Sequence, residues 1–390
     1  MFEPGAICHF LVHRGPVMNY PKLIGLAFSA SLALSAAAPA QDITIAVAGP
    51  LTGSEAVSGR QMTDGAGLAV ADINAAGGVL GRRLRYTVND DACDPKQARS
   101  VAEKLAGAKI PFVVGHFCSA SSIAASEVYA DANMLQISPA STATKFTDGK
   151  LWNVARVCGR DDQQGPAAAA YIMKAFAGKN VAILNDKNTY GKGLADETRK
   201  ALNAAGFREK MFESFNRGEI DFSAIVSRLK RENIDLVYVG GYPLESGLIL
   251  RQMREQGLKT VLMAGDALYD RAFASITGKD AEGALFTFGP DPRSNPAAKA
   301  VVDRFKARNV DPEGYTLHTY AAIQVWAQAV AKVGSTDSKK VMEAIKAGEW
   351  DTVIGKLSFD AKGDIKQIGY VLWKWDGKGN AVELAPGKGS

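Results

Sequence analysis

Short runs of β-branched and other apolar residues alternate along most of the chain with longer stretches in which apolar residues recur every three or four positions. The short runs predict buried strands, and the longer stretches predict amphipathic helices. The expected strands are Ile43–Ala48, Leu84–Val88, Phe112–Val114, Leu135–Ile137, Val181–Leu184, Leu236–Val239, Thr260–Met263 and Ala284–Phe288. The expected helices are Arg60–Ala75, Pro95–Ala106, Ser119–Asp131, Gln164–Phe176, Gly191–Ala205, Asp221–Glu232, Pro243–Gln256 and Pro296–Arg308. This alternation indicates βαβ units and therefore an α/β fold with parallel sheets.

Turn residues support several of these boundaries. Asp94 followed by Pro95 predicts a helix N-cap and first helical position, while Gly77-Gly78, Gly206 and Gly257 predict helix ends. No internal repeat of about 20–50 residues is visible, and no Ser/Pro-rich linker divides the chain. Any domain boundary is therefore expected to fall in short crossover segments.

The first forty residues differ from the rest of the chain. The stretch Leu23–Ala38 contains no charged residue, follows Lys22, and leads into the small-x-small sequence Ala-Pro-Ala at 38–40. This pattern predicts a signal peptide that is cleaved before Gln41, and hence export to the periplasm. A membrane anchor is the alternative, but the apolar core is shorter than the roughly 20 residues of a spanning helix.

The residues before this leader fit poorly with it. A leader that started at Met18, and not at Met1, would have an ordinary short charged segment before its apolar core. On that interpretation three residues that invite a metal-site hypothesis lie outside the mature protein: Cys8, His9 and His13.

Length and charge narrow the class of protein. Removing residues 1–40 leaves 350 residues, which suits two domains of the usual size of about 100–200 residues. The formal net charge is +5, with acids and bases interspersed, and this disfavours nucleic acid as a partner. The mildly basic balance is compatible with an anionic ligand or an acidic partner surface, although a solvated mixed-charge surface is the simpler explanation.

Three cysteines follow the leader: Cys93, Cys118 and Cys158. In an oxidising compartment two of them are expected to pair and one to remain free. Spacing alone does not choose the pair.

Catalytic and metal-binding patterns are missing from the part of the sequence that follows the leader. Its two histidines, His116 and His318, lie in neither a His-Glu-x-x-His nor a Cys-x-x-Cys pattern, and no nucleophile elbow, phosphate loop or dinucleotide-binding glycine motif occurs. We therefore expect no enzyme activity, no cofactor and no metal site. Acid pairs occur at Asp90-Asp91 and Asp161-Asp162, but solvated or hydrogen-bonded loops explain them more simply than general acid/base catalysis. A secreted hydrolase remains the rival hypothesis.

Ligand binding in a cleft is the remaining hypothesis for an exported two-domain α/β protein. Ligands of such folds gather beyond the carboxyl ends of parallel strands. Two polar turns, 115–119 and 138–142, follow expected strands. A helix beginning near Ser119 would offer free backbone N–H groups to a ligand carboxylate, although a simple N-cap serine is the alternative. The turn 138–142 carries the same ambiguity.

Several motifs resemble the leucine/isoleucine/valine-binding protein family. They are the segment 90–98 (Asp-Asp-Ala-Cys-Asp-Pro-Lys-Gln-Ala), the turn 115–119, Gln164-Gly165-Pro166, Tyr190-Gly191 and Gly240-Gly241-Tyr242. Their order and spacing match the family from about Asp42 to Asp376. The resemblance implies a type I periplasmic binding protein, which has two Rossmann-like lobes joined by a three-crossover hinge. By this analogy the N-terminal lobe comprises 42–160 and 290–368, and the C-terminal lobe comprises 161–289 and 369–385.

The resemblance also implies a set of site residues. In relatives a serine and an Ala-x-Thr turn hold the amino-acid carboxylate and amine, and these match Ser119, Ala140 and Thr142. The opposite lobe would contribute two tyrosines and an acid that faces the ammonium, while aromatic side chains and neighbouring turn residues would line the pocket. These positions match Tyr190, Tyr242, Asp266, Phe117, Cys118, Ser141 and Tyr315. The family disulfide falls on Cys93 and Cys118, which leaves Cys158 as a buried free thiol.

Two positions depart from the reference members of the family. This chain has Ser58 where they have tyrosine, which would enlarge or wet the side-chain pocket, and Asp266 where they have glutamate. The expected function is still a periplasmic substrate-binding protein of an ABC importer, a monomer that captures a branched-chain or related aliphatic amino acid by lobe closure and delivers it to a permease in the inner membrane. Another small carboxylate or an amide is the alternative ligand.

Overall fold

The computed structural model describes residues 9–19, 41–367 and 369–384. The chain divides into two units, 1–40 and 41–390, and the fold described below is that of the second unit. The expected signal-peptide core, Leu23–Ala38, lies outside the described residues. Within the described ranges, no helix combines the length and apolar character needed to cross a membrane.

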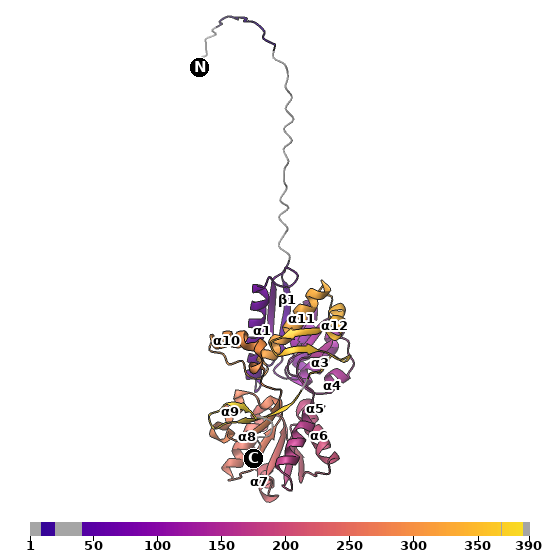
Figure 1. The fold of residues 1–390 in the computed structure, drawn as a ribbon, viewed down its shortest axis with the longest axis vertical. Helices are drawn as coiled ribbons and strands as arrows, with labels where there is room; N and C mark the ends of the chain where they lie inside the picture. The colour runs from indigo at the N-terminus through magenta and orange to yellow at the C-terminus, as the bar shows by residue number, and fades with distance from the viewer. Residues whose placement is uncertain (1–8, 20–40, 368, 385–390) are drawn as a thin grey trace, which may run out of the picture. The chain divides into compact units, whose positions relative to one another are not determined.

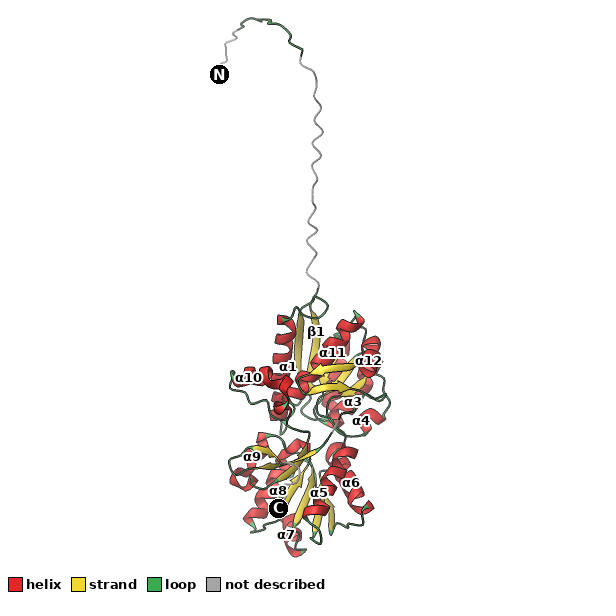
Figure 2. Cartoon of the chain, in the orientation of Figure 1, coloured by secondary structure: helices red, strands yellow, loops and turns green. Residues whose placement is uncertain are grey.

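The first sheet has five strands in the order β2-β1-β3-β4-β5. Figures 1 and 2 label its strand β1. Every neighbouring pair in it is parallel. Its strands are β1 (Ile43–Gly49), β2 (Leu84–Asp90), β3 (Phe112–Gly115), β4 (Leu135–Ser138) and β5 (Val154–Arg156). A separate hairpin pairs β11 (Glu349–Thr352) with β12 (Gly355–Ser358). We call the part of the chain built on this sheet the first lobe.

The second sheet has seven strands in the order β14-β13-β10-β9-β8-β6-β7, and the part of the chain built on it is the second lobe. Five of its strands are parallel, whereas β13 and β14 pair in antiparallel fashion at one edge. Its strands are β6 (Val181–Asn185), β7 (Met211–Ser214), β8 (Leu236–Gly240), β9 (Val261–Ala264), β10 (Leu285–Phe288), β13 (Val371–Trp375) and β14 (Ala381–Glu383).

Helices surround both sheets (Figure 2). Those of the first lobe are α1 (Ala56–Ala75), α2 (Pro95–Gly107), α3 (Ser119–Asp131), α4 (Lys145–Asp148), α10 (Lys299–Lys306), α11 (Thr316–Val333) and α12 (Ser338–Ala347). Those of the second lobe are α5 (Asp161–Ala175), α6 (Thr189–Ala204), α7 (Ser223–Arg231), α8 (Pro243–Glu255) and α9 (Arg271–Thr277). Short 3₁₀ turns complete the chain: Asp266–Leu268, Gly278–Ala281, Pro292–Ser294 and Pro296–Ala298.

The chain passes between the lobes three times. It leaves the first sheet after β5, returns after β10, and crosses again between β12 and β13. The fold class expected from the resemblance, two α/β lobes joined by three crossovers, is therefore confirmed. The N-cap expected at Asp94 is also present, because its side chain accepts a hydrogen bond from the Gln97 N–H (2.8 Å) and Pro95 begins α2.

The sequence pattern missed several elements. Helix α11 was not expected because its buried residues are spread around most of its circumference, so it lacks the polar face that marks an amphipathic helix. Trp326 of this helix stacks on Phe112 of β3, with the ring centroids 5.0 Å apart, and so anchors α11 to the first sheet. Strands β5, β7 and β11 to β14 were also missed, since each has only three to five residues and too few for a clear alternation.

A buried cluster of charged residues ties two of the crossovers together. Arg156, at the end of β5, forms an ion pair with Asp364 (2.6 Å), which lies on the segment between β12 and β13. Arg160, on the first crossover, reaches the other oxygen of Asp364 (2.8 Å). The Thr147 hydroxyl donates to the same carboxylate at 3.0 Å. Because Arg156 and Asp364 are both buried, each depends on the other for charge compensation.

We expect Asp364→Asn to lower the free energy of unfolding of the mature chain by about 3–5 kcal/mol, because it leaves two arginines short of their anion in a buried place. Urea unfolding followed by circular dichroism measures this loss. The matched control is Asp303→Asn, which removes an exposed carboxylate paired with Lys299 and should leave the midpoint nearly unchanged. Equal, small effects of the two substitutions would contradict a structural role for the cluster.

Candidate binding site

Two polar turns of the first lobe meet at the carboxyl edge of its sheet. The first connects β3 to α3, and the second follows β4. The Ser138 hydroxyl donates to the His116 carbonyl (2.7 Å), and the Ser141 hydroxyl donates to the Phe117 carbonyl (3.0 Å). The Ser119 hydroxyl accepts from the Ala143 N–H (3.3 Å). These bonds bring the two expected ligand-binding turns into direct contact.

Ser119 is the first residue of α3, and the N-cap position belongs to Cys118. The simple N-cap alternative for Ser119 is therefore not what the structure contains. Ser119 and Thr142 are both buried, and the Thr142 hydroxyl oxygen has no hydrogen-bond partner. A buried hydroxyl without a partner is costly, which marks Thr142 as a position that would gain from a ligand atom.

Arg156 holds the backbone of the second turn through hydrogen bonds. Its guanidinium donates to the Ser141 carbonyl (2.6 Å) and to the Ala143 carbonyl (3.1 Å). Since Arg156 is itself fixed by Asp364, the position of Thr142 depends on the buried charge cluster of the hinge. Ala140, also buried, donates its N–H to the Ser138 hydroxyl (3.2 Å).

The second lobe and the segment before α11 contribute a buried acid with two tyrosines. Asp266 follows β9, and its two carboxylate oxygens accept from the Tyr190 hydroxyl (2.9 Å) and the Tyr315 hydroxyl (2.5 Å). The Tyr190 ring lies 5.1 Å from the ring of Tyr242, and the Tyr315 ring meets Phe117 of the first lobe edge-on at 5.8 Å. Five expected site residues thus form one continuous set of contacts across the lobes.

Burial raises the pKa of Asp266, and hydrogen bonds from Tyr315 and Tyr190 oppose that rise. The pKa values of Tyr190 and Tyr315 are raised well above the ordinary value, first by burial and then by the charge of Asp266. Tyr190 and Tyr315 therefore remain protonated donors at neutral pH.

Asp161 lies beside the expected site residues, and its surroundings differ from those that the sequence predicted. It was expected in a solvated or hydrogen-bonded loop, but it is the first residue of α5, is buried, and neither carboxylate oxygen has a hydrogen-bond partner. Burial, and next the charge of Asp266, raise its pKa to about 8. The Thr142 hydroxyl, which lies near this carboxylate without forming a well-aligned hydrogen bond, and the charge of Arg156 partly oppose the rise. The rule that ligands gather beyond the carboxyl ends of parallel strands also points to Asp161. The rule was not applied there because the preceding strand β5, which has three residues, was not recognised in the sequence.

The other acid pair fits the expectation of a hydrogen-bonded loop. Asp91 contacts the His116 ring (2.5 Å) and accepts from the Cys93 N–H (2.8 Å). Asp90 accepts from the Leu51 N–H at 2.8 Å. These acids and His116 are therefore committed to holding the loops of the first lobe.

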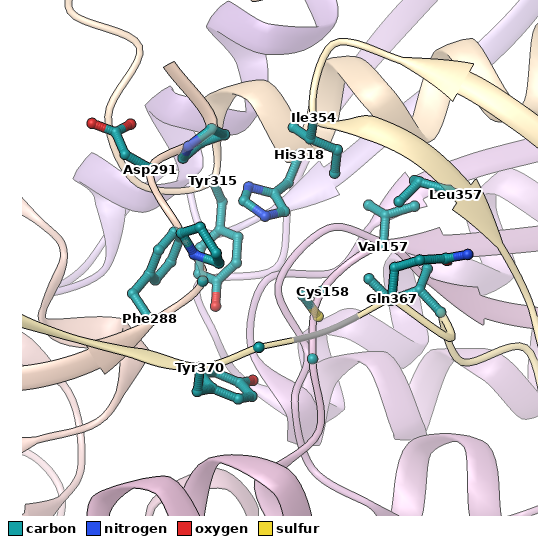
Figure 3. A pocket seen from close by; sticks show the side chains of 16 residues that line it. Val157, Cys158, Phe288, Asp291, Tyr315, His318, Ile354, Leu357, Gln367 and Tyr370 are labelled. Carbon is teal, nitrogen blue, oxygen red and sulfur yellow. The ribbon is translucent and has the colours of Figure 1, made fainter. Parts of the chain in front are cut away.

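A cavity of about 220 Å³ lies where the three crossovers pass between the lobes (Figure 3). Its walls include aromatic, aliphatic and thiol side chains: Phe288, Tyr315, Tyr370, Leu357 and Cys158. His318 also lines it, and burial lowers the pKa of this imidazole to about 4, so the ring is neutral at pH 7. The Tyr370 hydroxyl is buried without a partner. Tyr315 lines this space and donates its hydroxyl to Asp266.

Three expected pocket residues have other contacts. The Ser58 hydroxyl donates to Asp270 of the second lobe (2.6 Å), so it bridges the lobes and does not line the cavity. Cys118 forms a disulfide with Cys93, as the resemblance implied, and Cys158 is a buried free thiol. The Ser141 hydroxyl is bonded to Ser122 (2.7 Å) and to the Phe117 carbonyl.

Comparison with known proteins agrees with this architecture. The family model for periplasmic binding proteins matches residues 42–380. The chain belongs to the periplasmic binding protein family. Within it, the chain is 46% identical to the Leu/Ile/Val-binding protein homolog 1 of Brucella suis, over 92% of this chain and 98% of that protein. The resemblance seen in the sequence is thus confirmed.

Solved structures of periplasmic binding proteins have the same fold. The leucine-binding protein LivK of Thermotoga maritima superimposes with a TM-score of 0.81 at 28% identity, covering 88% of this chain and 98% of that one. The branched-chain amino acid transporter substrate-binding protein LivJ of Streptococcus pneumoniae, solved with isoleucine, also gives 0.81 at 26% identity, covering 88% of this chain and all (100%) of that one. The family is one of binding proteins of the periplasm.

We expect Asp161→Asn to stabilise the ligand-free protein by about 1–3 kcal/mol at pH 8, because it removes a buried carboxylate whose charge is only partly compensated. The pKa of Asp161 is raised from 3.8 to about 8 in the folded state, so folding is favoured by protonation and wild-type stability declines as pH rises between these values. The gain from the substitution should therefore be larger at pH 8 than at pH 5, as measured by urea unfolding.

The neighbouring Asp162 provides a matched control of opposite sign. Its hydrogen bond from Arg160 lowers its pKa, so it contributes stability above its ordinary pKa that is lost on acidification. Asp162→Asn should therefore destabilise the protein slightly at pH 8, by at most about 1 kcal/mol, since its side chain is 37% exposed. A destabilising Asp161→Asn at pH 8 would show that Asp161 has a stabilising partner.

Proposed function

We propose that this chain is the substrate-binding component of an ABC importer and that it captures a branched-chain or related aliphatic amino acid between its two lobes. The names of its relatives support this ligand class, because they describe Leu/Ile/Val binding in Brucella suis and an isoleucine complex in Streptococcus pneumoniae. The single observation that carries the proposal is the pair of buried acids, Asp161 and Asp266, beside partnerless Thr142.

The ligand ammonium is assigned to the two acids. Asp161 has both carboxylate oxygens free of hydrogen-bond partners, and Asp266 accepts two tyrosine hydroxyls. A carboxylate has about four acceptor sites, so Asp266 retains room for an ammonium donor. An ammonium between the acids would neutralise a charge that burial makes expensive.

The ligand carboxylate is assigned to the first lobe. Ser119 begins α3, where free backbone N–H groups and the positive end of the helix dipole favour an anion, and the Thr142 hydroxyl has no partner. Charge-assisted hydrogen bonds contribute about 1.5–3 kcal/mol each. A few such bonds, offset by the costs of association, support roughly micromolar affinity, which corresponds to about −8 kcal/mol.

The ligand side chain is assigned to the hinge cavity. Its walls of Phe288, Leu357 and the neutral ring of His318 suit an aliphatic group. Its one acidic wall residue, Asp291, already pairs with Arg293 (2.9 Å). Because Tyr315 both lines this cavity and bonds to Asp266, rotation of its ring would change how large a side chain can enter.

Binding is proposed to proceed by closure of the lobes, with 42–160 and 290–368 moving against 161–289 and 369–385. The first lobe would hold the carboxylate, and Tyr190, Tyr242 and Asp266 would add contacts in the closed state. Such differential contacts are what allows a ligand to shift the lobe equilibrium. The closed, loaded protein is then the form that the permease recognises. We further propose that the leader is removed before Gln41 on export to the periplasm.

A carboxylate without an amine is the second ligand class to consider, and a hydrolase is the rival outside the binding class. Two buried acids disfavour the first, since an additional anion beside them would be uncompensated. Binding without chemical change separates this chain from a hydrolase, because mass spectrometry of an incubated amino-acid, ester and amide panel would reveal cleavage products.

We expect Asp266→Asn to weaken leucine binding by tenfold or more, which corresponds to the 1.5–3 kcal/mol of a charge-assisted hydrogen bond. Calorimetry should show a much smaller loss for 4-methylpentanoate, which is leucine without its amine. Asp196→Asn, a surface change on α6, serves as the control and should bind both ligands normally. Equal losses for both ligands would make Asp266 structural, and a wild type that prefers 4-methylpentanoate would overturn the amino-acid assignment.

We expect Ser119→Ala combined with Thr142→Val to weaken leucine binding more than tenfold, because both hydroxyls are assigned to the carboxylate. Ser126→Ala is the control, since this hydroxyl of α3 bonds only to the Ile123 carbonyl (2.8 Å). Calorimetry on variants with unchanged circular dichroism decides the matter. Wild-type affinity in a folded double variant would place the carboxylate elsewhere.

A further inference from the structure

One arginine of the second lobe reaches into the first lobe. Arg217 follows β7, and its guanidinium forms an ion pair with Glu55 (3.1 Å), the residue before α1. The other terminal nitrogen contacts the Cys93 sulfur (3.0 Å) and the Cys93 carbonyl oxygen (3.5 Å). The Glu55 side chain is 1% exposed and that of Arg217 is 22% exposed, so the pair is screened little by water.

The same guanidinium also touches the proposed binding site. It packs over the ring of Tyr242 at 4.4 Å, and that ring lies 5.1 Å from Tyr190, which donates to Asp266. On the first-lobe side, Cys93 is joined by its disulfide to Cys118, the residue before Ser119. Arg217 thus contacts the second-lobe part of the proposed site directly, through Tyr242, and the first-lobe part through Cys93 and its disulfide.

Several acidic side chains surround the Arg217 guanidinium. Glu55, Asp186 and Glu245 face it, and Asp270 lies near Glu55. Burial raises the pKa of Glu55 to about 7, and Arg217 opposes that rise. Burial likewise raises the pKa of Asp186 to about 7, again opposed by Arg217 after a backbone hydrogen bond. Without this cation, the closed interface would bury a group of acids with weaker compensation.

We propose that Arg217 is an interlobe positioning residue that stabilises the closed lobes through Glu55 and Cys93 while it supports Tyr242. The Ser58–Asp270 hydrogen bond (2.6 Å) joins the same two lobes. We call these interlobe contacts, made by Arg217 with Glu55 and Cys93 and by Ser58 with Asp270, the clasp. This inference rests on the proposed function in that closure is taken to retain an amino acid. An interaction made only in the closed state slows ligand release without speeding ligand capture.

Stopped-flow kinetics of leucine binding test the clasp. We expect Arg217→Met to raise the dissociation rate ten- to a hundredfold with less than a threefold change in the association rate. Glu55→Gln should raise the dissociation rate as well. The double variant should release leucine little faster than the faster of the two single variants, because the two substitutions remove the same contact. Arg217→Lys, which keeps the charge but not the planar fork, should restore part of the slow release.

Arg228→Met is the matched control. Arg228 pairs with Glu213 (2.8 Å) inside the second lobe, so its loss should leave both rates unchanged. Unchanged dissociation rates in Arg217→Met and Glu55→Gln, or additive effects in the double variant, would overturn the clasp. If Arg217→Met does not fold, Glu55→Gln and Arg217→Lys carry the same test, because neither removes a buried cation.

A scattering experiment separates this inference from the proposed function. Failure of the wild type to bind any of the twenty amino acids would contradict the proposed function alone. The clasp is then judged on ligand-free protein, in which Arg217→Met should increase the radius of gyration relative to the wild type and to Arg228→Met. Identical radii in all three proteins would overturn it.

Discussion

The need to compensate buried negative charge governs this molecule. Asp161 and Asp266 are both buried, the charge of Asp266 raises the pKa of Asp161, and neither acid forms a salt bridge within the described residues. Tyrosine hydroxyls satisfy Asp266, whereas Asp161 has no hydrogen-bond partner. Uncompensated carboxylates in a protein interior are costly unless they are protonated or meet a cation. In the proposed function, a ligand ammonium would meet this requirement where the two lobes converge.

Two other buried acids, Asp364 and Glu55, are paired with arginines, and these arginines also contact residues of the site. Asp364 is held by Arg156 and Arg160, and Arg156 in turn fixes the carbonyl groups beside Thr142. Glu55 is held by Arg217 across the lobes. Asp161 and Asp266 differ from these two acids, because neither forms an ion pair among the described residues. We infer that the arginine pairs set the geometry of the site and that Asp161 and Asp266 leave a place for a charged ligand.

The sequence predicted those parts of the fold and site that depend on local order. The β3–α3 turn with Ser119 and the turn with Thr142 follow strands whose apolar runs are easy to recognise, so the carboxyl-edge rule located them. The family resemblance supplied Tyr190, Tyr242 and Asp266, and the structure joins Tyr190 and Tyr242 by ring contact and Tyr190 to Asp266 by a hydrogen bond. Which of these residues touch ligand stays a proposal.

Contacts between distant residues could not be predicted from the sequence. Arg217 and Glu55 are 162 positions apart, and Ser58 and Asp270 are 212 apart, so no periodicity connects them. Ser58 was assigned to the pocket because relatives have tyrosine there, yet its hydroxyl is used between the lobes. Asp161 was missed because burial of a carboxylate is a property of tertiary packing, which a residue pair such as Asp161-Asp162 does not reveal.

A crystal structure of the mature protein with leucine, at a resolution that places the ligand atoms, tests the central claim most directly. The account predicts an ammonium nitrogen within hydrogen-bonding distance, about 3 Å, of carboxylate oxygens of both Asp161 and Asp266. The ligand carboxylate should then lie against Ser119 and Thr142. A leucine bound with its carboxylate beside Asp266, or with its ammonium away from both acids, would contradict it.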